Sequence, residues 1–464
     1  MLTKSDFLTF LDAPMHLWAK SHDQIDPKPR SGYDQHLAQQ GQQVEALAKQ
    51  YLEQILLPGQ DLVWQPSFND GQFQIRADAL VWDETTEVYD LYEIKSATSV
   101  QKVHQYDLAF QILVLEGIIP LHHTYLLHIN KSYQHGQELE LEHLFTAKEL
   151  SAEVAEYKQE VAQLRQAAWQ VTQLVEPQPS FACIKPQSCP CPTLCHPNLP
   201  ENPIYSLPYL GKKAVSLRET GTLAIEELPE SFNLNPRQRI YVEAIRTGKA
   251  VIDNQAIQAS LAGLQYPLFF LDYETFNPAV PLFPGYHPYE HIVFQYSLFK
   301  IEEPGAQPSH FEAVFADGSD PAPKIVPHLL ENIGDRGSIL VWNQVFEAGR
   351  NKDLARRCPL HAQRLLNIIE RLYDLMLIFR EGQYVDPRFQ GSASLKAVLP
   401  VLCSELQYGD LTIQNGETAM LTWYHLHSGL ISPADRQTTI DALKAYCKRD
   451  TYGMVAIWEH LCSL

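Results

Sequence analysis

The sequence predicts an α/β protein with two separate αβ domains. At 464 residues the chain is long enough to bury two or three hydrophobic cores, and its 45% hydrophobic and 20% charged residues are typical of globular proteins. Runs with strand character alternate twice with runs of helical periodicity, once before residue 176 and again after residue 262. A proline-rich stretch over residues 176–208 separates the two series and marks the main domain boundary.

The first series predicts a domain over residues 1–200 that ends with a group of cysteines. Helical periodicity covers residues 34–56, 102–117 and 146–175. Strand-like runs, rich in β-branched and aromatic residues, cover residues 62–68, 73–83, 88–97 and 123–130.

The second series predicts another αβ domain over residues 263–464, joined to the first by a helical connector over residues 201–262. The connector contains a capped helix candidate at residues 233–248. Strands are expected at residues 266–276, 291–303, 309–316 and 338–343. Helices are expected at residues 321–334, 355–379 and 436–461.

Net charge and the N-terminus limit the classes of partner. The formal net charge of −19 argues against a protein that coats nucleic acid by simple electrostatics, because phosphate binding normally rests on Lys and Arg. Acids gathered around divalent cations would account for part of this charge. The first residues carry acids where a signal peptide has its apolar region, and no apolar run is long enough to span a bilayer. We expect a cytoplasmic protein with no membrane partner.

A first group of chemically active residues lies on two neighbouring strands. Asp78 falls in the run 73–83, and Glu93 and Lys95 fall in "YEIKSA". The period of two in a strand places Glu93 and Lys95 on one face. Two carboxylates can hold Mg2+ or Mn2+ against a phosphate, and a neighbouring ammonium can orient the attacking water. The plainer alternative is that these side chains are solvated charges on edge strands.

The order of these residues resembles the RecB-type branch of the PD-(D/E)XK nucleases. The resemblance rests on Gly41-x3-Glu45, on Asp78 and Glu93-Ile-Lys95, and on a glutamine in a following helix, Gln111. It implies a restriction-endonuclease-like fold. It also implies metal ligands at Glu45, Asp78 and Glu93, a catalytic lysine at Lys95, and substrate contacts from Tyr106 and Gln111.

Four of the eight cysteines lie together in "CIKPQSCPCPTLC": Cys183, Cys189, Cys191 and Cys195. Clustered thiols in a chain without an export signal indicate a metal site before disulfides. Some RecB-type nucleases hold an iron-sulfur cluster with one N-terminal cysteine and three later ones, the last two spaced as Cys189-x5-Cys195. In this chain Ala13 stands where that N-terminal cysteine would be, and Cys191 is the nearby substitute. The resemblance implies a [4Fe-4S] cluster, with Zn2+ or unligated cysteines as the alternatives.

A second group of acids begins at "DYETF", directly after the apolar run 266–271. Asp272 and Glu274 share one strand face and can reach the same cations. Glu347 lies in "WNQVFEAG", where a strand leads into a helix. Tyr446 and Asp450 lie four residues apart in the last predicted helix and therefore share a face. These residues predict a four-carboxylate, two-metal site in which Tyr446 orients the water. The alternative is a structural domain with incidental acids.

These motifs resemble those of the DEDD superfamily of 3'-5' exonucleases, in the subgroup with a motif tyrosine. The superfamily pattern is D-x-E, then N-x2-3-F-D, then Y-x3-D, on a ribonuclease H-like sheet, and this chain has Glu347 where the second motif usually has Asp. The stretches "FLDYETFNPAVPLFPGYHPYEHIVFQYSLF" and "GSASLKAVLPVL" are similar to a bacterial family catalogued as domain of unknown function 2779. That resemblance extends over essentially the whole chain and implies a fold and a metal-site layout.

The stretch "GSASLKAVLP" adds Ser394 and Lys396 at the start of a helix. Small hydroxyl residues and one lysine at a helix N-terminus can bind phosphate, or Ser394 can act only as an N-cap. Together these features predict a metal-dependent nuclease with two candidate sites and nucleic acid, DNA before RNA, as partner. Two alternatives remain open. The chain is a partly decayed nuclease that serves as a nucleic-acid-binding scaffold, or it is a metal-dependent nucleotide phosphohydrolase.

Overall fold

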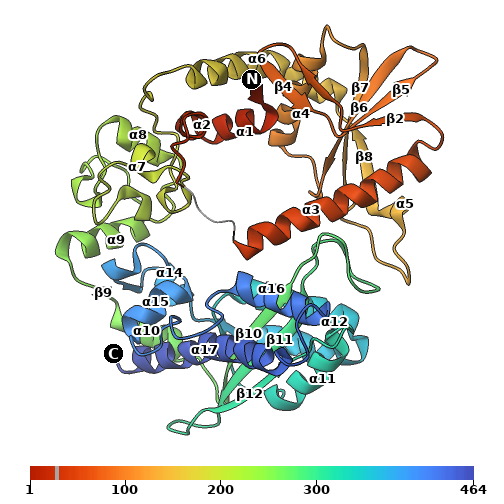
Figure 1. Cartoon of the computed structure of the whole chain (residues 1–464). Helices are drawn as coiled ribbons and strands as arrows, with labels where there is room; N and C mark the ends of the chain where they lie inside the picture. Colours follow the sequence, from red (N-terminus) through yellow and green to blue (C-terminus); the bar gives the residue numbers. More distant parts are fainter. Residues whose placement is uncertain (27–30) are drawn as a thin grey trace. The chain divides into compact units, whose positions relative to one another are not determined.

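The structure, a computed structural model, describes residues 1–26 and 31–464, which form two compact units (Figure 1). The first unit consists of Met1–Leu199 together with Pro278–Glu290. The second consists of Pro200–Asn277 and His291–Leu464. Both units combine helices with mixed sheets, so the expected α/β class is confirmed at this level. No helix in the described part of the chain has the length and apolarity that crossing a membrane requires.

The first unit is built on a five-stranded sheet in the order β2-β5-β6-β7-β8. These strands are β2 (Asp61–Trp64), β5 (Ala79–Asp83), β6 (Val88–Lys95), β7 (Leu121–Ile129) and β8 (Phe145–Glu149). β6 runs antiparallel to β5 and parallel to β7. A small second sheet contains β1 (Leu2–Thr3), β4 (Phe73–Arg76) and β3 (Ser67–Asn69). The strand expected over residues 73–83 is therefore two strands in different sheets, and Asp78 lies in the break between them.

Helices cover both faces of the five-stranded sheet. α3 (Gly32–Tyr51) packs against the face that carries Tyr92 and Ile94, and its start is fixed by a capping box. The opposite face carries Leu91 and packs against α1 (Lys4–Asp12), α4 (Lys102–Leu115) and α6 (Ser151–Thr172). Because side chains alternate along β6, Glu93 and Lys95 point toward α4. α2 (Pro14–Ser21) follows α1 after a single residue.

The loop between the first two strands of the second unit, residues 278–290, folds as part of the first unit. Two backbone hydrogen bonds join it to His135: the N–H of His135 donates to the Tyr286 carbonyl, and the N–H of Gly285 donates to the His135 carbonyl. The Tyr289 hydroxyl donates to the Ser96 carbonyl at 2.5 Å. Ser96 follows Lys95, so this loop is anchored beside the end of β6.

The second unit is built on a five-stranded sheet in the order β12-β11-β10-β13-β14. These strands are β10 (Leu268–Phe276), β11 (Ile292–Ile301), β12 (Ser309–Val314), β13 (Ile339–Val341) and β14 (Leu372–Asp374). The central strand β10 pairs antiparallel with β11 and parallel with β13. The chain therefore leaves β10 toward one side of the sheet and later adds strands on its other side. The carboxyl end of β10 is therefore a topological switch point, that is, a place where the order of strands reverses. Open α/β sheets typically bind ligands at such points.

The apolar residues of β10 alternate between two layers of helices. Phe269 and Leu271 pack against α11 (Ala322–Ile333) and the layer of α12 (Gln344–Arg357) and α13 (Ala362–Glu370). Leu268 and Phe270 pack against the layer of α10 (Asn254–Leu261), α15 (Leu395–Leu402) and α17 (Arg436–Cys462). Since period-two alternation continues, Asp272 and Glu274 share the α17 side.

The single helix expected over residues 355–379 is wrong. α12 ends at Arg357, α13 ends at Glu370, and the edge strand β14 follows before α14 (Leu377–Arg380). A three-residue strand is too short to show its own periodicity inside an amphipathic run. The remaining regular elements are α5 (Leu141–Leu144), α7 (Pro192–Cys195), α8 (Lys213–Glu219), α9 (Pro236–Thr247), β9 (Val251–Ile252), β15 (Tyr384–Val385) and α16 (Gly416–His427).

Candidate metal and active sites

The first acidic centre is a network of charged side chains at the end of β6. Lys95 Nζ donates to Glu93 Oε1 at 2.5 Å and to Asp107 Oδ2 at 2.8 Å. Lys4 Nζ, from the start of α1, lies 2.8 Å from the same Glu93 oxygen. Gln111 Nε2 donates to Glu93 Oε2 at 2.8 Å and to Asp107 Oδ1 at 3.1 Å. Three elements, α1, β6 and α4, therefore meet at one buried carboxylate.

Two members of this network, Lys4 and Asp107, were missed by the sequence analysis. Asp107 could have been predicted from the sequence, because it lies four residues before Gln111 and so shares the α4 face that points at β6. Lys4 could not, since 89 residues separate it from Glu93 and only the packing of α1 brings it there.

Burial and the two ammonium groups control the charge of this centre. Burial alone would raise the pKa of Glu93, but Lys95 and Lys4 hold it at about 2. Burial and the Glu93 charge raise the pKa of Asp78 to about 7, although its Oδ2 accepts the backbone N–H of Ile94 at 2.8 Å. Glu93 and Asp107 are thus paired with cationic side chains of the chain itself, and two ammonium groups lie where a metal ion would bind.

Two other residues expected at this centre lie apart from the network. Glu45 Oε1 accepts a hydrogen bond from Gln65 Nε2 at 2.5 Å. Tyr106 is buried, and its ring packs edge-on against Tyr157 of α6 with a centroid distance of 5.3 Å. The structure therefore brings Asp78, Glu93, Lys95 and Gln111 together, as the sequence predicts, and gives Glu45 and Tyr106 other contacts.

The second acidic centre lies at the end of β10. Ligand atoms of Asp272, Glu274 and Cys447 lie within 4.8 Å of one another, and Cys447 Sγ is 3.8 Å from Asp272 Oδ2. Cys447 comes from α17 and was not predicted at the site. The strand alternation predicted for Asp272 and Glu274 is confirmed by this grouping.

α17 contributes a further carboxylate, that of Asp450, to the second acidic centre. Tyr446 hydrogen-bonds to Asp450, which confirms that the two residues share a helix face, and the Tyr408 hydroxyl donates to Asp450 Oδ1. Lys396 lies above both rings, with Nζ 5.3 Å from the Tyr446 centroid and 5.5 Å from that of Tyr408. Lys396 is therefore placed close to the acids without forming an ion pair with Asp450.

Glu347 enters from α12 on the other side. It is buried, and its Oε2 has no hydrogen-bond partner among the described residues. Its helix turn is held by Asn351, whose Nδ2 donates to the Glu347 carbonyl at 2.8 Å and whose Oδ1 accepts from the Tyr273 hydroxyl at 3.2 Å. A buried carboxylate oxygen without a donor is costly, so this atom is suited to receive a cation or a water.

The four carboxylates repel one another at this centre. Burial and the Asp450 charge raise the pKa of Asp272 to about 8. Burial and the neighbouring Asp272 raise the pKa of Glu347 to about 9 and that of Glu274 well above its ordinary value. Within residues 1–26 and 31–464 no Lys, Arg or His forms an ion pair with any of the four. A bound cation would relieve this repulsion.

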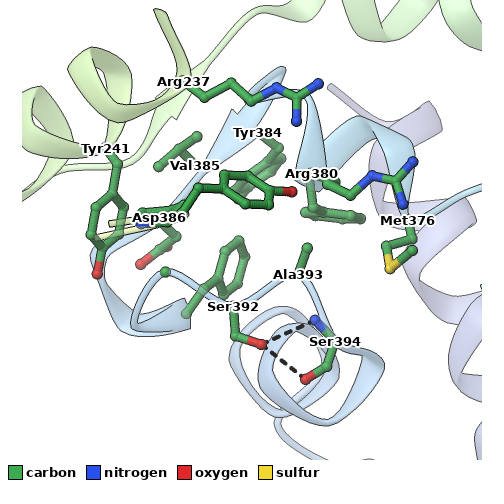
Figure 2. Close-up of a pocket in the computed structure, with 16 residues that line it drawn as sticks. Arg237, Tyr241, Met376, Arg380, Tyr384, Val385, Asp386, Ser392, Ala393 and Ser394 are labelled. Carbon is green, nitrogen blue, oxygen red and sulfur yellow. Dashed lines mark hydrogen bonds between the residues drawn. The ribbon is translucent and has the colours of Figure 1, made fainter. Parts of the chain in front are cut away.

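A cavity of about 370 Å³ lies beside α15 in the second unit (Figure 2). Its lining includes five aromatic residues, two arginines, two serines and one acid: Tyr209, Tyr241, Phe379, Tyr384, Phe389, Arg237, Arg380, Ser392, Ser394 and Asp386. Ser394 is the N-cap of α15, two residues before Lys396. Met376, also in the wall, lies two residues after Asp374, whose charge contributes to the raised pKa of Glu347. The chain that lines the cavity therefore continues into the second acidic centre.

The loop before α15 is shaped by packing. Gly391 has a φ of +75°, and a Cβ there would lie 1.8 Å from the Ser206 carbonyl oxygen, so only glycine fits. Ser394 makes no side-chain capping bond; its Oγ is 3.1 Å from Ser392 Oγ, while its N–H donates to the same hydroxyl (Figure 2). The Ser394 hydroxyl thus faces the cavity wall and remains accessible.

The four clustered cysteines form a buried core with residues of α2 and the preceding residue, Ala13. Ligand atoms of Cys189, Cys191, Cys195 and His16 all lie within 4.8 Å of one another, and Cys183, Cys189 and His196 form a second such group. This arrangement can hold a metal ion. Sequence reasoning missed His16, which stands three residues after Ala13, the position at which an N-terminal cysteine was expected.

Comparisons with known proteins match part of the chain. Residues 269–394 match the family model described as "Domain of unknown function (DUF2779)". The match includes Asp272, Glu274 and Glu347 but ends before Tyr446 and Asp450. It supports the expected family resemblance over this stretch and not over the whole chain.

One curated relative is an "Uncharacterized protein MG366 homolog" from Mycoplasma pneumoniae. It is 28% identical over 207 residues, covering 40% of this chain and 31% of the relative. The chain therefore spans about a third of the length of this relative. No solved structure matches the chain.

Proposed function

We propose that the second acidic centre hydrolyses phosphodiester bonds of nucleic acid, as a 3'-5' exonuclease site. One observation carries this proposal: four carboxylates from β10, α12 and α17 converge without a cationic partner from the described chain. Such a group is costly to keep ionised, and a pair of divalent cations between the acids and a phosphate would offset that cost.

Asp272, Glu274, Glu347 and Asp450 would hold Mg2+ or Mn2+, both of which prefer carboxylate oxygens. When bound, such ions supply a polarised phosphate and a water that ionises more readily. Glu347, in place of the shorter Asp of the DEDD pattern, has the orphaned oxygen Oε2 available for this role. The residues present therefore fit the ions.

The chain's own groups would position the reacting atoms. Burial and the Asp450 charge raise the pKa of Tyr446, so its hydroxyl stays protonated. Its proton is donated to Asp450, and its oxygen can accept a hydrogen bond from the attacking water and so orient it. Lys396, above the Tyr446 ring, would draw the negative backbone toward the acids. The aromatic cavity of Figure 2, with Arg237 and Arg380 at its rim, would stack a terminal or neighbouring base.

The first acidic centre has residues in the positions of a nuclease site, but a lysine already contacts its central carboxylate. The positions of Glu93, Lys95 and Gln111 fit the PD-(D/E)XK resemblance, with Lys95 beside the carboxylate. Lys4, however, makes the same carboxylate contact and would have to move before a metal ion could bind. This observation favours a second function for the first unit, namely a nucleic-acid-binding scaffold derived from a nuclease.

The proposal is tested by incubating the full chain with 5'-labelled single and double strands of DNA and RNA in Mn2+. We expect shortening from the 3' end, and at least about a hundredfold slower shortening by Asp272→Asn. Asp317→Asn, which changes an exposed acid in a loop, is the matched control. Equal rates for wild type and Asp272→Asn would contradict the proposal.

The same preparation separates the remaining alternative. A nucleotide phosphohydrolase would release inorganic phosphate from mononucleotides and leave labelled strands intact. A scaffold would bind labelled strands without shortening them, with or without the Asp272 carboxylate.

A further inference from the structure

We propose that His16, Cys189, Cys191 and Cys195 bind a single Zn2+ ion and that Asp12 orients the histidine ligand. The proposal concerns the cysteine core of the first unit and is independent of the phosphodiester chemistry proposed above. It replaces the [4Fe-4S] cluster that the family resemblance implies.

Two of the six distances between the ligand atoms match the edges of a tetrahedral site, and the other four are within 4.8 Å. Cys191 Sγ and Cys195 Sγ are 3.6 Å apart, and His16 Nε2 is 3.5 Å from Cys189 Sγ. With Zn–S bonds of about 2.3 Å and Zn–N bonds of about 2.0 Å, a tetrahedral site has S···S edges of about 3.8 Å and N···S edges of about 3.5 Å. All four ligand atoms lie within 4.8 Å of one another.

An iron-sulfur cube fits this set less well. In a [4Fe-4S] cluster each thiolate binds a different iron at a corner of the cube, so the ligand atoms must spread around a body several atoms wide. Three thiols and an imidazole gathered within 4.8 Å leave room for one ion. Imidazole with thiolates is a ligand set typical of structural zinc.

The partner of His16 supports a ligand role. His16 Nδ1 is 2.6 Å from Asp12 Oδ2, one helical turn earlier in the chain. This contact keeps the proton on Nδ1 and leaves the Nε2 lone pair directed at the thiols. A carboxylate behind a metal-bound histidine is a common way to fix the ring and to increase its basicity.

The other two potential ligands form an adjoining pair. His196 Nε2 is 3.2 Å from Cys183 Sγ, and both are buried. Cys183 also interacts with His16 and Cys195. We assign this pair to the surroundings of the ion, where His196 stabilises the neighbouring thiol. A hydrogen bond to a coordinated sulfur or to its neighbour changes the affinity of the site for the metal ion.

The ion would cross-link two distant segments of the first unit and would thereby affect the position of Lys4 in the first acidic centre. It would join α2 to the segment after α6, across 173 residues of sequence. α1 and α2 are separated only by Ala13, and α1 begins with Lys4, which contacts Glu93. Zinc binds only where the ligands have been brought together by folding, so it would stabilise the folded position of α2. Since α1 is joined to α2 through Ala13, zinc would also help to keep Lys4 at the Glu93 carboxylate.

Metal analysis of the purified full chain tests the proposal. From medium containing both iron and zinc, and with anaerobic handling, we expect a colourless protein with one Zn2+ per chain. Iron with acid-labile sulfide and a broad visible absorption would overturn it, and so would a folded protein with neither metal.

Ligand variants test the role of His16. We expect His16→Ala to weaken Zn2+ binding, measured by competition with a chelator, by more than a hundredfold, and Asp12→Asn to weaken it by about tenfold to a hundredfold. His22→Ala, at the end of the same helix but outside the group, is the control and should bind Zn2+ as wild type does. Unchanged affinity in His16→Ala would overturn the assignment.

Cobalt replacement gives a readout that does not depend on stability. Co2+ in the wild-type site should show the intense visible bands of tetrahedral coordination with three sulfur ligands. His16→Cys should keep the site and increase the sulfur-to-cobalt charge-transfer absorption by about one third, since it adds a fourth thiolate. An identical spectrum for wild type and His16→Cys would show that residue 16 is not a ligand, even if His16→Ala fails to fold.

Discussion

The two acidic centres are built from similar residues but balance their charge in opposite ways. In the first, Lys4 and Lys95 donate to Glu93, and Lys95 also donates to Asp107. In the second, Asp272 and its neighbouring acids have no cationic partner within bonding distance in the described chain. The first centre contains its own counter-ions, whereas the described part of the chain supplies none in contact with the second.

This difference predicts which centre responds to divalent cations. An ion entering the first centre would compete with two ammonium groups already at the carboxylate, and displacing them costs their hydrogen bonds. An ion entering the second centre would relieve repulsion and satisfy the orphaned Glu347 Oε2. A pair of carboxylates in a motif is therefore not sufficient to predict a metal site, because the charge of the surroundings decides.

The largest expected effect on stability comes from removing an internal counter-ion. Lys95→Met should lower the free energy of unfolding by about 3 kcal/mol, because it leaves Glu93 and Asp107 with too little compensation in a buried place. Asp272→Asn should leave it unchanged or raise it when no divalent cation is present, because it removes repulsion. Urea unfolding of both variants measures the difference.

A double variant sharpens this result. Lys95→Met combined with Glu93→Gln should recover part of the loss, because the buried charge and its partner are then removed together. If Lys95→Met and Asp272→Asn destabilise the protein equally, the proposed contrast between the centres is wrong.

The pH dependence of stability should show a smaller effect. Folding raises the pKa of Asp272 from 3.8 to about 8, so the folded state binds the proton more tightly than the unfolded state. The stability that this proton provides is fully present below about pH 4 and is lost as pH rises through about 8. Without divalent cations, the wild type should therefore lose stability relative to Asp272→Asn over this range.

Unfolding curves of the two proteins at several pH values give this difference directly. Saturating Mn2+ should remove or reverse the trend, since the ion favours the ionised carboxylate. A constant difference from pH 4 to pH 8 would show that Asp272 is not held protonated in the folded chain.

The smallest effect is expected at the cavity beside α15. Arg380→Ala should weaken binding of a single strand by a few fold and reduce the slope of log affinity against log salt by about one, because one phosphate contact is lost. Arg336→Ala, an exposed arginine in a loop away from the cavity, is the control. Fluorescence anisotropy at several salt concentrations measures both quantities, and equal slopes for the two variants would remove the cavity from the binding site.

Local periodicity was sufficient to predict which residues of the same strand or helix lie on one face in each centre. The period of two placed Glu93 beside Lys95, and Asp272 beside Glu274, as the structure shows. The helical period placed Tyr446 over Asp450. These relations depend only on neighbours within four residues, which explains why sequence alone was enough.

Relations across the fold were not predictable in this way. Lys4 reaches Glu93, and His16 reaches Cys189, only because α1 and α2 pack against distant parts of the first unit. The loop 278–290 folds with the first unit although its sequence neighbours belong to the second. Such contacts arise from tertiary packing and leave no periodic pattern in a single sequence.

Titration of Mn2+ into the metal-free carboxylate sites by calorimetry, with the cysteine site kept loaded, tests the contrast most directly. The wild type and Asp78→Asn should both bind Mn2+, whereas Asp272→Asn should lose this binding. Retained binding in Asp272→Asn, or its loss in Asp78→Asn, would contradict the account, because the ion would then be held by the centre that already contains its own lysines.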